Sequence, residues 1–144
     1  MARGYRRKRY YSTSMRVLIH LSASPAHEPA ALAAVTQEGI AAATRSGRTT
    51  ATKWLARMEA KGLVTGERAH VPGHRVRKTV YRLTHDGWIE ATKLRGRLRT
   101  DIVEVVAPGL DPTLMRIAEV PEIFPAYVNL TTAVSLVKGG RLDF

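Results

Sequence analysis

The segment from Arg48 to Gly62 constrains the fold of this 144-residue chain more than any other stretch. Ala51, Leu55 and Met58 recur at helical spacing, so a helix over residues 48–61 carries all three on one face. The opposite face carries Thr50, Lys53 and Arg57. Gly62 is a typical helix stop, because glycine readily adopts the left-handed conformation that closes a helix. The pattern therefore predicts a helix with one face packed and the other free to bind.

A shorter helix is predicted immediately upstream, over residues 36–43. The hydroxyl of Thr36 is suited to cap it. Residues 44–47 form a short, glycine-containing turn of the kind that sets two helices at a steep angle, and Ser46 or Gly47 would cap the second helix. This stretch predicts a helix-turn-helix.

A basic hairpin is predicted downstream. Residues 63–71 and 78–83 are strand-like, and they bracket a Pro-Gly turn with a basic tip at 72–77. A helix-turn-helix followed by such a hairpin is a winged helix. We therefore expect an α+β fold, mainly helical, with a two-stranded wing.

Four segments resemble MarR-type winged helix-turn-helix regulators of the archaeal kind. They are Thr-Gln-Glu-Gly-Ile-Ala at 36–41, Glu-Ala-Lys-Gly-Leu-Val at 59–64, His-Val-Pro-Gly at 70–73 and Val-Tyr-Arg-Leu-Thr-His-Asp-Gly at 80–87. They cover roughly the middle half of the chain, and their joint spacing is more specific than any single piece. The resemblance implies that the helix at 48–61 is a recognition helix and that the hairpin is a wing.

The same resemblance implies a set of DNA contacts. The residues expected in the major groove are Arg48, Thr49, Thr50, Thr52 and Lys53. Arg57 would hold a phosphate, and the wing would add His74, Arg75 and Arg77. The long flanking helices that build MarR-type dimers are not obvious in this sequence. A homodimer is still expected, because two symmetric half-sites multiply affinity.

Positive charge is concentrated where these contacts are predicted. The chain has 23 Lys and Arg against 12 Asp and Glu, a net charge of +11, which makes a polyanion the expected partner. Residues 45–99 contain fourteen basic and four acidic side chains, and residues 1–20 contain six basic and no acidic ones. Residues 101–144 contain three basic and six acidic side chains, so this part is not expected to lie on phosphate.

Residues 1–13 are predicted to be a basic, flexible arm. Arginines, including Arg6, Arg7 and Arg9, alternate with tyrosines there, which suits phosphate contact, groove insertion or base stacking. A mobile, solubilising tail is the competing interpretation, because runs of like charge are usually mobile.

The remaining elements of the predicted domain, residues 14–100, have weaker signals. A first helix is expected over 14–21 with Ser14 as its cap, and residues 30–35 fit either a helical turn or a short first strand. Thr84 would cap a further helix over 85–99, whose basic face is either solvated or near DNA. Trp54 could stack on a base, but its place beside Leu55 favours packing at the edge of the core, against the wing.

Residues 101–144 are predicted to be a small appendage. Residues 101–106 and 114–120 are strand-like around a Pro-Gly turn, and residues 125–138 look helical before Gly139 and Gly140 end them. This appendage could mediate self-association, receive an effector or join a further domain.

Several chemistries have no support in the sequence. There is no cysteine, no glycine-rich phosphate loop and no nucleophile motif, so neither an enzyme nor a bound cofactor is expected. His70 and His74 have a metal-like spacing, but they lie across a Pro-Gly turn without a carboxylate cluster, and no metal is expected. No run of about 20 apolar residues exists to cross a membrane, so a soluble, cytoplasmic protein is expected.

The sequence thus predicts a sequence-specific regulator that binds double-stranded DNA. Three other classes compete with it: an RNA- or ribosome-associated winged helix, a non-specific architectural DNA binder, and a protein-interaction module. The positive recognition face argues against the last of these, because interaction modules need an apolar or mixed-charge surface.

Overall fold

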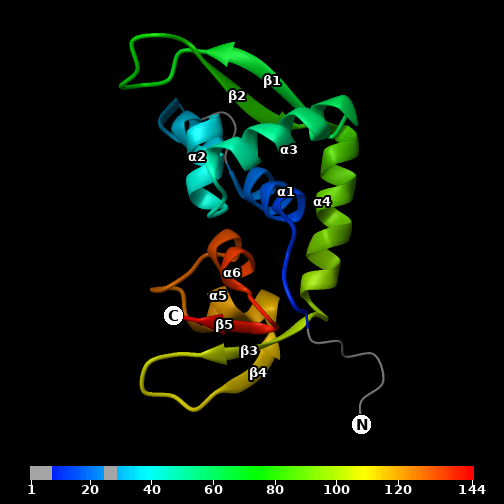
Figure 1. Ribbon diagram of the computed structural model, residues 1–144, viewed down its shortest axis with the longest axis vertical. Helices are drawn as coiled ribbons and strands as arrows, with labels where there is room; N and C mark the ends of the chain where they lie inside the picture. Colours follow the sequence, from blue (N-terminus) through cyan, green and yellow to red (C-terminus); the bar gives the residue numbers. More distant parts are fainter. Residues whose placement is uncertain (1–7, 25–28) are drawn as a thin grey trace.

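The chain forms two halves joined by one long helix (Figure 1). The computed structural model describes residues 8–24 and 29–144. The first half contains α1 (Thr13–Ala23), the 3-10 segment η1 (Pro29–Val35), α2 (Gln37–Ala43), α3 (Arg48–Ala60), β1 (Val64–Ala69) and β2 (Lys78–Leu83). The joining helix is α4 (His85–Leu98). The second half contains β3 (Ile102–Val106), β4 (Thr113–Arg116), η2 (Ile117–Glu119), α5 (Val120–Ile123), α6 (Leu130–Leu136) and β5 (Arg141–Asp143). The expected α+β class is confirmed.

α3 has the two faces that its sequence predicts. Ala51, Leu55 and Met58 are buried, and the helix packs on α1, α2 and β1. It ends at Ala60, where Gly62 has a φ of +76° and the Leu63 amide donates to the Met58 carbonyl at 2.9 Å. The glycine closes the helix as expected, because the left-handed conformation lets terminal carbonyls find donors.

The turn between α2 and α3 is hydrogen-bonded to α1. Thr44 is fully buried and its hydroxyl donates to the Ile40 carbonyl at 2.7 Å. Arg16 of α1 donates from Nη1 to the Thr44 carbonyl at 2.8 Å. Arg45 has a φ of 54°, the left-handed conformation that lets α2 end and the chain turn sharply. The steep α2–α3 arrangement therefore depends on contacts with α1.

The strands β1 and β2 form an antiparallel hairpin, in register from Val64 with Leu83 to Ala69 with Lys78. Thr36 adds an isolated bridge to Val80 beside it. The ambiguous stretch before Thr36 is thus a 3-10 helix that ends in a one-residue strand contact.

Two threonines start helices with the same geometry. The Thr36 hydroxyl accepts from the Gly39 amide at 3.1 Å, and the Thr84 hydroxyl accepts from the Gly87 amide at 3.0 Å. Both glycines lie against backbone, since a Cβ on either would be 2.0 Å from a carbonyl oxygen, that of Ala33 or that of Leu63. Close packing, and not capping, therefore explains why position N3 of each helix is a glycine.

The second half contains a mixed three-stranded sheet in the order β4-β3-β5. β3 pairs antiparallel with β4, as the hairpin prediction requires, but it also pairs in parallel with β5, which was not predicted. The second predicted strand ends at Arg116, because residues 117–123 turn into η2 and α5. The prediction of a helix over 125–138 was wrong in extent: α6 begins after Asn129, whose side chain accepts from the Thr132 amide at 2.9 Å.

The described part of the predicted arm lies along the second half. The Lys8 amide donates to the Ile102 carbonyl at 2.9 Å, and the Gly140 amide donates to the Arg9 carbonyl at 3.0 Å. Tyr11 is buried, and its hydroxyl donates to Asp101 Oδ2 at 2.8 Å. Burial, followed by this hydrogen bond, raises the pKa of Tyr11. Tyr11 is thus a structural residue, which corrects its assignment to a free nucleic-acid-binding arm.

α1 starts one residue earlier than expected and is capped differently. It begins at Thr13, and Ser12 accepts from the Met15 amide at 3.3 Å, so Ser14 is not its cap. One continuous cluster of buried apolar side chains then runs through both halves; among its members are Val17, Leu55, Leu94, Val103 and Leu142. The change of architecture near residue 100 is therefore not a break in the core.

Replacing Gly87 with alanine is expected to lower the free energy of unfolding by about 3 kcal/mol or more, because the new Cβ would clash with the Leu63 carbonyl. Gly62→Ala is the matched control, since open space surrounds Gly62 and only its positive φ is penalised, at about 1 kcal/mol. Urea unfolding measures both variants. Equal losses would contradict the close approach.

Below pH 6.5 the fold is expected to lose stability through His20. Burial lowers the pKa of His20. The hydrogen bond of its ring with the Ala34 carbonyl, at 2.7 Å, raises the pKa but only partly offsets the effect of burial. The unfolded chain therefore takes up a proton near pH 6.5 that the folded chain resists, so the free energy of unfolding falls by at most about 1.4 kcal/mol per pH unit. Urea unfolding at several pH values between 7 and 5 gives the free energy of unfolding as a function of pH. The slope of this plot should be shallower for His20→Gln than for the wild type, and unchanged for the exposed control His70→Gln. Identical slopes for all three proteins would contradict this account.

Candidate nucleic-acid interface

The solvent face of α3 presents a surface of mainly polar and basic side chains. Every residue predicted to touch DNA from this helix is exposed: Arg48, Thr49, Thr50, Thr52, Lys53 and Arg57. Their spacing follows from the burial of the opposite face, since Ala51, Leu55 and Met58 fix the rotation of the helix. We refer to these six residues as the α3 face.

The amino terminus of α3 is open. Gly47 occupies the cap position and, having no side chain, makes no cap hydrogen bond, whereas side-chain oxygens cap α1, α2 and α4. The first amides of α3 thus point away from the helix without a side-chain acceptor, at its positive end. Such amides bind phosphate oxygens well.

The hydroxyl of Thr52 is already engaged within the helix. It donates to the Arg48 carbonyl at 2.9 Å, which leaves its oxygen lone pairs and its methyl group facing solvent. Thr52 can therefore accept a hydrogen bond or contact a methyl group.

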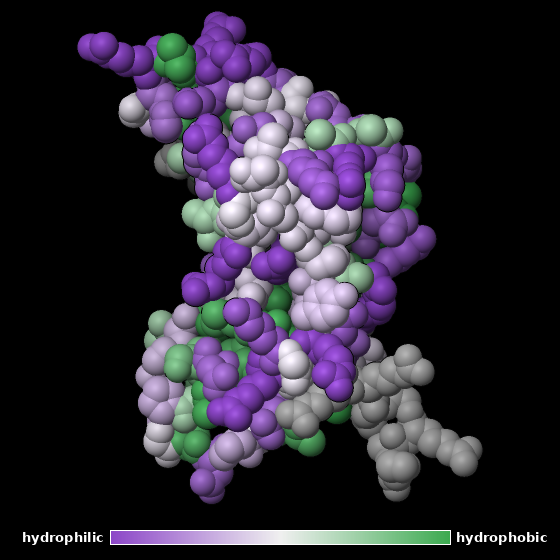
Figure 2. Space-filling view, in the orientation of Figure 1, coloured by the Kyte–Doolittle hydropathy of each residue, from purple (hydrophilic) through white to green (hydrophobic). Residues whose placement is uncertain are grey.

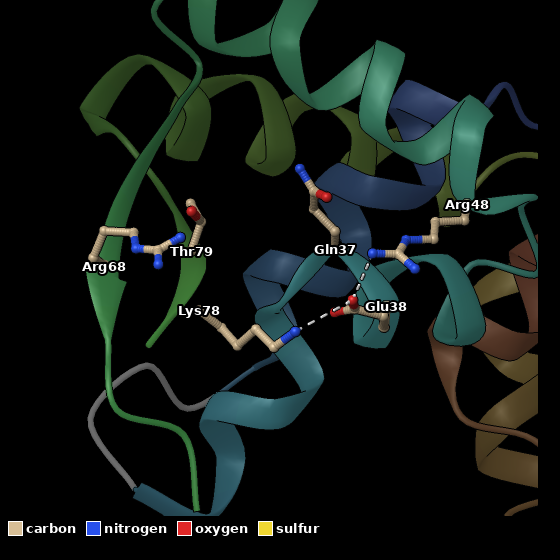
Figure 3. A pocket seen from close by; sticks show the side chains of 6 residues that line it. All are labelled: Gln37, Glu38, Arg48, Arg68, Lys78 and Thr79. Atoms are coloured by element: carbon tan, nitrogen blue, oxygen red, sulfur yellow. Dashed lines mark ion pairs between the residues drawn. The ribbon is translucent and has the colours of Figure 1, made fainter. Parts of the chain in front are cut away.

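An open cavity of about 300 Å³ lies between α2, α3 and the hairpin (Figure 3). Its lining residues are Gln37, Glu38, Arg48, Arg68, Lys78 and Thr79. The carboxylate of Glu38 pairs with Arg48 at 3.0 Å and lies 3.9 Å from Lys78 Nζ. A single carboxylate thus sits between a cation of α3 and a cation of the hairpin.

The charge on Glu38 is stabilised in this position. A hydrogen bond from its own backbone amide, followed by the charges of Lys78 and Arg48, lowers the pKa of Glu38. The group is therefore ionised at neutral pH. Its side chain remains 44% exposed, so its ion pairs are open to competition from another anion.

The loop between β1 and β2 carries the predicted wing residues. His74, Arg75 and Arg77 are all exposed, and Gly73 turns the chain with a φ of +87°. Figure 2 shows hydrophilic side chains covering this end of the molecule, while hydrophobic ones gather over the second half. The structure thus brings a basic loop and the α3 face to the same half of the molecule (Figure 1).

Trp54 confirms the packing interpretation but not the expected partner. Its half-buried ring lines a groove with residues of α1 and α4, such as Met15 and Glu90, and not with the hairpin. The guanidinium of Arg57 lies over the ring, 5.0 Å from its centroid. Arg57 therefore reaches solvent from a position fixed by Trp54.

Of the predicted arm arginines, Arg9 is the one that the structure describes, and it is not brought to this surface. Arg9 is exposed, but its carbonyl is bound by Gly140 in the second half, away from α3. Arg6 and Arg7 lie outside the described residues.

Sequence reasoning missed five of the six cavity residues, among them the charged residues Glu38, Arg68 and Lys78. These residues come together only through the tertiary fold. The strand register pairs Arg68 with Thr79, and the α2–α3 turn brings Glu38 to Arg48. Neither contact has a local pattern in the sequence.

No protein-family model matches the chain, and neither the curated proteins nor the solved structures contain a match. Within the described parts of the chain, no helix is long and apolar enough to span a bilayer. Over the same residues, no group of three or more His, Asp or Glu side chains is arranged to hold a metal ion.

Glu38→Gln is expected to raise the affinity for duplex DNA by about three- to tenfold at low salt, because it frees Arg48 and Lys78 for phosphate and removes a repelling charge. The slope of log affinity against log salt should become steeper. Fluorescence anisotropy at several salt concentrations measures both quantities. Glu119→Gln, which removes a similar exposed ion pair with Arg116 in the second half, is the control and should change neither. Weaker binding by Glu38→Gln would mean that this cavity is not on the DNA-binding surface.

Proposed function

We propose that the chain is a sequence-specific regulator that binds double-stranded DNA through a winged helix of the MarR-like type. In this proposal α3 is the recognition helix and the β1–β2 loop is the wing. One observation carries it: the α3 face has six exposed basic and hydrogen-bonding residues, and a basic loop accompanies it. The element order α1, α2, α3, β1, β2, with the Thr36 bridge beside β2, also supports it.

Base reading would fall to the threonines and Lys53. In the major groove each base pair presents a distinct set of donors, acceptors and methyl groups. Lys53 can only donate hydrogen bonds, and Thr52, whose hydroxyl hydrogen is engaged, can still accept one. The hydroxyls of Thr49 and Thr50 can donate and accept. This mixed set suits reading of base edges, whereas a purely basic helix would suit phosphate alone.

Phosphate binding would fix the register of α3 in the groove. The open amides after Gly47 and the guanidinium of Arg57 would each hold a phosphate oxygen. Arg48, Arg68 and Lys78 line the cavity at the junction with the hairpin, where a phosphate would compete with Glu38. These contacts position the protein without reading sequence.

The wing would reach the neighbouring backbone or the minor groove. Arg75 and Arg77 extend from the loop into solvent, and arginine is favoured by the negative potential of a narrow minor groove. A homodimer bound in this way would recognise two half-sites about 34 Å apart.

Selection of duplex fragments by the purified protein at near-physiological salt, followed by footprinting, tests the proposed function. The expected result is an enriched motif whose protected bases lie in the major groove, with structured RNA competing poorly. Enrichment without a motif would support an architectural DNA binder, and stronger binding to RNA would support an RNA-associated protein. Either result would overturn the proposal.

Lys53→Ala and Arg75→Ala are expected to affect DNA binding differently. The first should cost about 1–3 kcal/mol on the selected site and blur its sequence preference, because it removes a base contact. The second should weaken binding to selected and scrambled duplexes alike. Lys138→Ala, an exposed lysine of the second half, is the control and should leave binding unchanged. Anisotropy with the two duplexes measures all three, and equal small effects of Lys53→Ala and Arg75→Ala would contradict major-groove reading.

A further inference from the structure

A groove of about 430 Å³ lies where α1, α3 and α4 meet. α1 packs against both α3 and α4, and Figure 1 shows it between them. α1 therefore forms the floor of the groove, and α3 and α4 form its two walls. The groove shares Arg57 with the α3 face, but it is separate from the cavity at Glu38.

The floor of the groove is apolar. Its apolar residues come from α1, from α3 and from the link between α3 and β1: Met15, Leu18, Trp54, Met58 and Leu63. Met15, Trp54 and Leu63 are only half-buried, so apolar surface faces solvent here. Two of the five are methionines, whose flexible side chains adapt to the shape of an inserted group. The floor thus suits one large apolar side chain.

Both walls of the groove carry positive charge. Arg57 and Lys61 lie on the α3 side, one turn apart, and Arg97 lies on the α4 side; all three are exposed. Of the described residues that line the groove, Glu90 is the single carboxylate, and Lys93 pairs with it at 3.5 Å from outside the lining. Cations therefore lie on both sides of an apolar floor.

This arrangement determines which chemistry fits the groove. A small organic anion with one charged group would reach the cations of one wall only. A nucleic-acid backbone would satisfy the cations but leave the apolar floor in water, which is unfavourable. A peptide segment with acidic side chains on both sides of a large apolar residue satisfies the floor and both walls at once. Its length also fits, since Glu90 and Arg97 are about 10 Å apart along α4, and three extended residues span about the same distance.

We propose that this groove binds an acidic segment of a partner protein. One apolar side chain of the segment lies on the floor, and its carboxylates pair with Arg57, Lys61 and Arg97. Because Arg57 also belongs to the α3 face, the segment and DNA compete for one guanidinium, so each lowers the affinity for the other. Binding in the groove does not depend on the proposed function, whereas the competition rests on it. The partner is thus an antagonist of DNA binding.

Arrays of synthetic nine-residue peptides test the binding. One set has Leu, Met or Phe at the centre and Asp and Glu around it. A second set has Gly at the centre, and a third set has Lys and Arg in place of the acids. Binding is expected within the first set only, and its tightest peptide becomes the labelled probe. Equal binding of the glycine set would indicate charge attraction without the floor, and this result, preference for the basic set or no binding at all would overturn the proposal.

Charge variants place the probe in the groove. At 0.15 M salt Arg97→Gln and Lys61→Gln should each weaken probe binding about three- to fivefold in anisotropy, because each removes one partly exposed ion pair. Arg99→Gln is the matched control: Arg99 is exposed directly after α4 but does not line the groove, and its loss should change binding little. Glu90→Gln should strengthen binding, because it removes a repelling carboxylate. Equal effects of Arg97→Gln and Arg99→Gln would contradict binding in the groove.

The fluorescence of Trp54 reports directly on the floor. The chain has two tryptophans, so Trp88→Phe leaves Trp54 as the single one. The probe should move its emission to shorter wavelength, because the inserted side chain displaces water from the half-buried ring. Unchanged emission at saturating probe would contradict insertion into the floor.

Titration of the probe into a complex with the selected duplex tests the competition. The wild type should release the duplex, and Arg97→Gln should need about three- to fivefold more probe to do so. Binding of the probe without release of the duplex would overturn the competition. A protein that binds the probe in the groove but binds no duplex would contradict the proposed function and leave the acidic-segment site in place, so the two failures are distinguishable.

Discussion

The position of the α3 face depends on one junction, where Thr84 joins the end of α3 to the start of α4. Its amide donates to the Leu63 carbonyl at 3.0 Å and its hydroxyl donates to the Gly62 carbonyl, while the same hydroxyl accepts from Gly87. Because Gly87 has no side chain, α4 can lie directly against the backbone at Leu63. β1 begins and β2 ends at this junction, so the junction fixes the hairpin, α3 and α4 relative to one another.

Charge divides the molecule into two halves, whereas one hydrophobic core joins them. Basic residues are concentrated on the α3 face and the hairpin, and the second half is mildly acidic although it shares the core. Within the basic half Glu38 stands between Arg48 and Lys78, where the proposal puts a phosphate. A carboxylate in this position separates two cations that would otherwise repel each other, and it yields to a stronger anion.

The sequence predicted the parts of the fold that local signals encode. The buried stripe of α3, its glycine stop at Gly62, the Thr36 and Thr84 caps and the β1–β2 hairpin all follow from residues within one or two turns of each other. β5 could not be predicted, because a strand of three residues is too short to show an alternating pattern of apolar and polar side chains. Its parallel pairing with β3 also joins segments that are more than 30 residues apart in the sequence. The Tyr11–Asp101 hydrogen bond was missed because its partners are 90 residues apart. The Glu38–Arg48 pair was missed because it forms only once the turn between α2 and α3 is in place.

Amide chemical-shift mapping with a duplex from the fragment selection tests the central claim most directly. If α3 is the recognition helix, titration with DNA should shift the amides of residues 48–57 and of the 70–78 loop, and the amides of residues 101–144 should stay in place. A titration in which the second half shifts while α3 does not, or in which nothing shifts at concentrations that saturate binding, would contradict the claim that the α3 face reads DNA.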